Sequence, residues 1–143
     1  MIVVDRCIEL AISRGAILHS TKFDFIDHGK LFVVLGQNEE RIVGFFFINS
    51  KISPFVFRNH RSFVMQMHIK RSDYPKILHY DAYIGCHELT HIPIDELVKQ
   101  LMNGGAQIRG RLKEEDLNRI LDEVRKSDLF TQSEKDSFFR LEV

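Results

Sequence analysis

Two dense apolar runs separated by a polar turn constrain the fold of this chain more than any other feature. They lie within residues 28–35 and 42–51, and both are rich in β-branched and aromatic side chains. Residues 36–41, Gly-Gln-Asn-Glu-Glu-Arg, form the polar turn between them. This pattern is typical of two strands joined by a turn. Because each run is continuous rather than alternating, we expect both faces of each strand to be covered, as in a small barrel or sandwich.

The rest of the chain adds a short helix before these strands, further strands after them, and helices at the end. Period-two alternation indicates strands, and apolar residues at helical spacing indicate helices. The expected strands lie at about 29–35, 42–50, 63–70 and 76–85. The expected helices lie at 5–14, from Pro93 to Gly104, at 113–126, and after Thr131. Pro54 is expected at an edge or a bulge of the 52–57 segment. This order predicts an α+β fold built on a small, partly open antiparallel barrel.

Composition limits the function classes that the chain can belong to. The 143 residues favour one domain, and 20 basic against 20 acidic residues give a formal net charge of zero. A role on nucleic acid therefore needs a local basic patch. The densest basic cluster contains Arg58, His60, Arg61, His68, Lys70 and Arg71. A solvated strand edge with its loops is the alternative interpretation of that cluster.

The chain carries no signature of secretion, membrane insertion or cofactor binding. Two cysteines and charges close to the N-terminus predict a reduced cytoplasmic protein without a signal peptide. No run reaches the roughly 18 to 20 apolar residues of a membrane helix, so no membrane association is expected. P-loop, dinucleotide-binding and nucleophile-elbow motifs are absent from the sequence. We therefore expect no cofactor.

The sequence His87-Glu88-Leu89-Thr90-His91 matches the H-E-x-x-H zinc motif. On a helix, this spacing places two imidazoles on one face, and the glutamate activates a zinc-bound water. Here the preceding residues alternate as a strand does, and Pro93 suits the start of a helix rather than its interior. We therefore expect a strand-to-helix connection with two exposed histidines and no metal. A zinc hydrolase is the alternative.

The stretch from His28 to about Ile94 resembles the PemK/MazF-like family. Members are small SH3-like barrels that act as ribonuclease toxins in toxin–antitoxin pairs. Three features are similar and occur in the same order. They are Gly29-Lys30 leading into an apolar strand that ends Val33-Val34-Leu35, a second strand that ends Asn49-Ser50-Lys51, and a later strand Tyr80-Asp81-Ala82-Tyr83-Ile84-Gly85-Cys86 followed by a helix. The resemblance implies an SH3-like barrel over 16–92, within a domain of residues 1–105, and a C-terminal helical extension over 106–143.

The resemblance also implies a site at the ends of these strands. Family members usually begin the strand after the glycine with Arg-Pro, where this chain has Leu31 and Phe32. The candidate cation is Lys30, Arg58 or Arg61. Family members often place a hydroxyl at the end of the next strand, which the resemblance assigns to Ser50. Some members use an acid on the later strand, which the resemblance assigns to Asp81.

RNA cleavage beside a 2′-hydroxyl needs a base, an acid and a cation on the phosphate. In a hairpin, the segment from His28 to Lys30 lies beside Asn49 and Ser50. Alternation places His79 and Asp81 on one face, so His28 or His79 with Asp81 can form the base–acid pair. The predicted catalytic residues are thus His28, Lys30, Ser50, His79 and Asp81, and the predicted RNA-binding residues are Lys51, Arg58 and Arg61.

Two function classes stay open at this point. One is a metal-independent toxin-type endoribonuclease, with single-stranded RNA as substrate, an antitoxin-like protein as partner, and a homodimer as its assembly. The other is a catalytically inactive SH3-like barrel that binds a protein or a nucleic acid. Arrest of growth on induced expression distinguishes the first class from the second.

Overall fold

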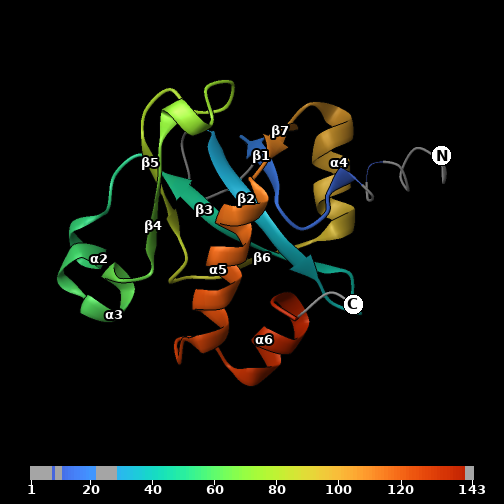
Figure 1. The fold of residues 1–143 in the computed structure, drawn as a ribbon. Helices are drawn as coiled ribbons and strands as arrows, with labels where there is room; N and C mark the ends of the chain where they lie inside the picture. Colours follow the sequence, from blue (N-terminus) through green and yellow to red (C-terminus); the bar gives the residue numbers. More distant parts are fainter. Residues whose placement is uncertain (1–7, 9–10, 22–28, 141–143) are drawn as a thin grey trace.

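In the part of the chain that the structure describes, seven strands form one antiparallel sheet, which is the frame of the molecule (Figure 1). The computed structural model describes residues 8, 11–21 and 29–140. In chain order the elements are β1 (Ala16–Ser20), β2 (Lys30–Gln37), β3 (Ile42–Asn49), α2 (Pro54–Arg58), α3 (His60–Phe63), β4 (Gln66–Ile69), a 3-10 turn η1 (Arg71–Asp73), β5 (Ala82–Gly85), β6 (Thr90–Pro93), α4 (Ile94–Asn103), β7 (Ala106–Arg111), α5 (Glu114–Lys126) and α6 (Gln132–Phe138).

The strand order is β4-β5-β3-β2-β1-β7, and β6 also pairs with β3. Strand β3 uses one edge for two partners. Its first half pairs with β6, and its last residues, Ile48 and Asn49, pair with β5. Strands β5 and β6 therefore follow one another along β3, separated by a short turn.

The predicted hairpin is β2 and β3, and its turn is fixed by Asn38. The Asn38 side-chain oxygen accepts hydrogen bonds from the backbone N–H groups of Glu40 and Ile42, each at 3.0 Å. Arg41 has a φ of 63°, the left-handed conformation that closes such a tight loop. In the resulting register Val33 lies opposite Phe46, and Leu31 lies opposite Ile48.

Each face of the sheet has its own apolar core. One core joins the sheet to α5 and α6, and it includes Phe46, Ile120 and Phe139. The other core joins the sheet to α4 through Ile94 and Leu97. Figure 1 shows α5 lying across the sheet and α4 at its other side. The continuous apolar runs of β2 and β3 follow from this two-sided cover.

The α+β class is confirmed, but the sheet does not close into a barrel. Among the described residues, β4 and β7 are its two edge strands and do not pair with each other. Helices α5 and α6 bury the face that barrel closure would otherwise cover. Ile120, Leu121, Val124, Phe138 and Phe139 supply the apolar side chains.

The C-terminal segment has the predicted helices and one strand that was not predicted. Helix α5 ends at Lys126, and the box formed by Thr131 and Glu134 caps α6, with bonds in both directions. Residues 106–111 are strand β7, paired with β1. Four of its six side chains are exposed, so it lacks the apolar pattern of an inner strand. The segment 106–143 therefore begins inside the sheet rather than as a helix.

Three local predictions were wrong. Pro54 begins the short helix α2, which the Ser53 hydroxyl caps by accepting from the Val56 N–H. Residues 63–65 lie at the end of α3 and in a turn, and strand β4 begins only at Gln66. Residues 76–81 are also irregular, because the Tyr74 carbonyl accepts from the N–H groups of Ile77 and Leu78. The expected helix 5–14 lies mostly outside the described residues. In the described part of the chain, no helix is long and apolar enough to cross a membrane.

Candidate functional site

A cavity of about 320 Å³ opens at the ends of β2 and β3, and we call it the strand-end cavity. Residues of strands β1, β2, β3, β5 and β7 and of the loop before β5 line it. Its polar lining residues are His19, Lys30, Ser50, His79, Tyr80 and Arg109. Two imidazoles and two cations therefore line one cavity, at the strand ends where the sequence predicts a site.

His19 is positioned by the sheet and by a glycine. It lies on β1 opposite Leu31 of β2 and opposite Gln107 of β7. Its ring packs directly over Gly29, where an added Cβ would lie 2.2 Å from Cε1 and Nε2 of the ring. Any other residue at position 29 would therefore displace the imidazole.

The environment of His19 favours its neutral form. Burial lowers the pKa of the imidazole, and the positive charge of Arg109 lowers it further. At neutral pH the ring is therefore uncharged and can accept a proton. A general base needs this property together with access to substrate, and His19 lines the cavity.

Lys30 is a half-buried cation at the same strand end. Its Nζ donates to the Ile48 carbonyl at 3.3 Å and to the Asn49 side-chain oxygen, and it lies 5.7 Å from the centre of the Phe47 ring. Burial lowers the pKa of the ammonium group. No carboxylate among the described residues lies within ion-pair distance of it. A cation held by neutral acceptors retains charge to offer to an anionic ligand.

A second cavity, of about 500 Å³, lies beside α2, and we call it the α2-side cavity. Asn49, Lys51, Phe55, Gln66 and His87 are among its lining residues. Asn49 connects the two cavities, because its side-chain oxygen accepts from Lys30 of the strand-end cavity.

Hydrogen bonds determine the tautomer of His87. The Gln66 side-chain nitrogen donates to the Ser62 carbonyl at 3.0 Å, and it lies 2.8 Å from His87 Nδ1. Since the amide nitrogen is a donor, Nδ1 accepts and the ring proton is on Nε2. Burial lowers the pKa of His87, which agrees with a neutral ring. His87 Nε2 lies 4.0 Å from a Glu88 carboxylate oxygen, so the Nε2 proton lies on the side of this carboxylate.

The structure brings together three of the five predicted catalytic residues. Lys30, Ser50 and His79 line the strand-end cavity, and His28 lies outside the described residues. Of the three candidate cations, only Lys30 is at this site. Arg58 is exposed in the last turn of α2, and Arg61 pairs with Asp128 at 2.5 Å.

Asp81 does not line the strand-end cavity, and the predicted pairing with His79 rested on a strand that is not there. The Asp81 carboxylate accepts from the Arg71 N–H at 2.9 Å and lies 3.7 Å from His68 Nε2. Alternation fails because strand β5 begins only at Ala82. Asp81 therefore holds the turn around η1 in place.

We expect Asp81→Ala to lower stability by about 0.5–1.5 kcal/mol, the usual contribution of one hydrogen bond, because alanine cannot accept from the Arg71 N–H. Urea unfolding measures the change, and Asp81→Asn is the control, since its side-chain oxygen can still accept this hydrogen bond. Equal stability of the alanine variant and the wild type would show that Asp81 does not hold this turn.

The H-E-x-x-H segment is not a helix. His87 lies in the turn after β5, and His91 lies on β6. The two rings have different neighbours, because His87 bonds Gln66 and the His91 ring centre lies 5.1 Å from that of Phe138. Over the residues that the structure describes, no group of three or more His, Cys, Asp or Glu side chains is arranged to hold a metal ion.

Sequence reasoning missed His19, Arg109 and His87 as site residues. His19 and Arg109 are 90 positions apart and meet only because β7 pairs with β1. Gly29 and the apolar strand after it predicted where the site lies, but they did not predict the His19 imidazole that packs over Gly29. His87 stands out in the sequence only through the H-E-x-x-H spacing, which carries no sign of its contact with Gln66.

No protein-family model matches this sequence, and no curated protein matches it.

Proposed function

We propose that the protein is a divergent PemK/MazF-like toxin that cleaves single-stranded RNA without a metal ion. One observation carries this proposal: His19, His79, Arg109 and Lys30 line a single cavity at the ends of β2 and β3. Acid–base groups and cations around one cavity are the components of RNA cleavage by the 2′-hydroxyl.

In the proposed reaction the 2′-oxygen attacks the adjacent phosphorus, and the bond from phosphorus to the 5′-oxygen breaks. Neutral His19 takes the proton of the 2′-hydroxyl, and His79 supplies a proton to the leaving 5′-oxygen. Arg109 and Lys30 stabilise the charge that develops on the phosphate oxygens. The products are a 2′,3′-cyclic phosphate and a 5′-hydroxyl, so no water or cofactor is consumed in this step.

The test is incubation of the protein with mixed-sequence single-stranded RNA in the presence of a chelator. DNA of the same sequence is the control, because it lacks the 2′-hydroxyl. We expect cleavage of the RNA only, with cyclic-phosphate ends. Intact RNA at high concentrations of folded protein would reject the proposal.

A barrel-derived module that binds nucleic acid or protein without cleaving it is the second candidate. One observation favours it: Phe32, where family members usually have the proline of Arg-Pro, is fully buried, and Leu31 beside it carries no charge. Under the toxin proposal the remaining expectations are an antitoxin-like partner and a homodimer, which co-purification and light scattering would test.

The pH dependence of cleavage is expected to report on His19. Its pKa is lowered in the folded protein, so the active neutral form persists as the pH falls, and the rate declines only below the ordinary histidine value of about 6.5. Arg109→Gln removes one cause of the lowering and should move this decline to higher pH. An acid limb at unchanged pH in the variant would contradict the role of His19 as base.

A further inference from the structure

Helices α2 and α3 expose an unusual number of large apolar side chains. Phe55 is 76% exposed, Phe57 is 65% exposed and Phe63 is 38% exposed, and Val64 beside them is 57% exposed. The rings of Phe57 and Phe63 form an edge-to-face pair with centres 5.2 Å apart. We call these four residues the aromatic surface. Adjacent exposed aromatic residues are a feature of binding surfaces.

The chain segment that carries the aromatic surface contains no acidic residue. Residues 41–72 have no aspartate or glutamate, although the whole chain has 20 acidic residues. Acidic residues from outside this range contact three of its arginines: Asp95 pairs with Arg41, Asp128 pairs with Arg61, and the Asp81 carboxylate accepts from the Arg71 N–H. Glu88 also lines the α2-side cavity. The cations beside the exposed rings are therefore Lys51 and Arg58, which are both exposed.

We propose that the aromatic surface is a platform on which successive bases of single-stranded RNA stack, while Lys51 and Arg58 contact the phosphates. Base stacking on aromatic rings beside a cationic groove is how proteins hold single strands without sequence readout. A duplex fits poorly, because its bases already stack on one another. The inference deepens the proposed function and rests on it for the choice of RNA as the strand.

The platform is connected to the strand-end cavity. Phe55 and Lys51 line the α2-side cavity together with Asn49. Asn49 accepts from Lys30, which lines the strand-end cavity. A strand stacked on α2 can therefore pass along the α2-side cavity and present a phosphodiester at the end of β2.

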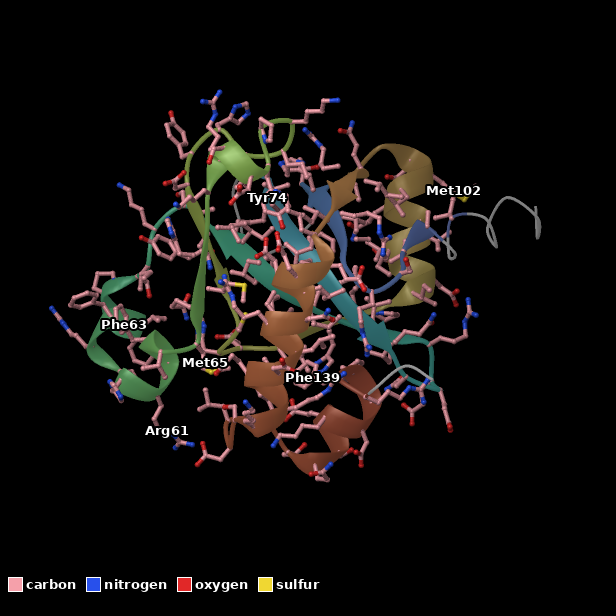
Figure 2. All side chains as sticks on the ribbon, in the orientation of Figure 1. Arg61, Phe63, Met65, Tyr74, Met102 and Phe139 are labelled. Carbon is pink, nitrogen blue, oxygen red and sulfur yellow. The ribbon has the colours of Figure 1, made fainter. Side chains whose placement is uncertain are left out.

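The platform residues are presented by a locally stable framework. Val56 is buried beneath α2, and the side chains of Ser53 and Asn59 cap α2 and α3. Figure 2 shows Phe63 and Arg61 at this end of the molecule, and Met102 on the opposite side. Substitution of an exposed ring here removes a contact surface without opening a core.

The test is fluorescence anisotropy with a labelled 2′-O-methyl oligouridine of about 12 nucleotides, which cannot be cleaved. The variants are Phe55→Ala, Phe57→Ala and the double substitution. Met102→Ala is the control, because Met102 is 53% exposed on the distant helix α4. We expect each phenylalanine substitution to weaken binding at least about fivefold and the control to leave it unchanged. Arg58→Gln should reduce the slope of log affinity against log salt concentration by about one, because one phosphate contact is lost.

Unchanged affinity in the double variant would overturn the inference. So would a wild-type dimer that the double variant dissociates while its affinity for RNA stays the same, because the surface would then contact a second copy of the chain. Failure of the proposed function has a different signature. In that case the oligouridine binds and the double variant weakens it, but no RNA is cut.

Discussion

His19→Ala is expected to lower the rate of RNA cleavage about 100- to 10,000-fold, the usual effect of losing a positioned proton-transfer group. Burial and the charge of Arg109 hold the pKa of His19 low, so the wild-type ring is neutral and can accept a proton, as the proposed reaction requires. The measurement is the initial rate of cleavage of a single-stranded RNA with chelator present.

The control is His68→Ala. His68 is exposed on β4, pairs with Asp81, and does not line the strand-end cavity. The His68→Ala variant should cleave RNA at the wild-type rate. The His19→Ala variant should bind the uncleavable oligouridine as tightly as the wild type does. A His19→Ala protein that cleaves at the wild-type rate would exclude His19 as the base. Equal losses in both variants would indicate a general effect of removing histidines on folding.

The β2–β3 hairpin could be predicted because its information is local. Two apolar runs flank a turn that the Asn38 side chain closes, and all of these residues lie within one short stretch. Helices α4 and α5 were equally predictable, because Leu97 and Ile120 repeat with helical period and face the two cores.

The alternation around residue 80 was misleading because tertiary contacts override it. Tyr74 donates to Asp116 of α5 at 2.5 Å and accepts from the Lys113 N–H, and this anchors the loop that carries His79. Those partners lie about 40 residues further along the chain, so no local pattern reveals them. The same loop then turns Asp81 toward Arg71 instead of along a strand.

The location of the candidate site could be predicted from the sequence, but not all of the residues that form it. Lys30 and Ser50 are local to the hairpin ends, so the pattern of the two runs located them. Arg109 reaches the site only through the pairing of β7 with β1. Strand β7 lies at the edge of the sheet and most of its side chains are exposed, so its sequence lacks the apolar pattern of an inner strand.

The largest effect on stability is expected from Phe139→Ala, which should lower the free energy of unfolding by about 3–5 kcal/mol. The Phe139 ring is fully buried, with its centre 5.9 Å from that of Phe46 on β3 and 5.0 Å from that of Phe130. Its removal leaves a cavity beside the rings of Phe46 and Phe130. Urea unfolding followed by circular dichroism measures the change.

Phe57→Ala is the matched control, since the same ring is lost from an exposed position and the effect should stay within about 0.5 kcal/mol. The comparison also tests why the sheet stays open. If α5 and α6 bury the face that barrel closure would cover, Phe139→Ala must destabilise the whole domain in one transition. A separate early transition, with the sheet unaffected, would mean that the C-terminal helices fold apart from it and that another cause keeps β4 and β7 from meeting.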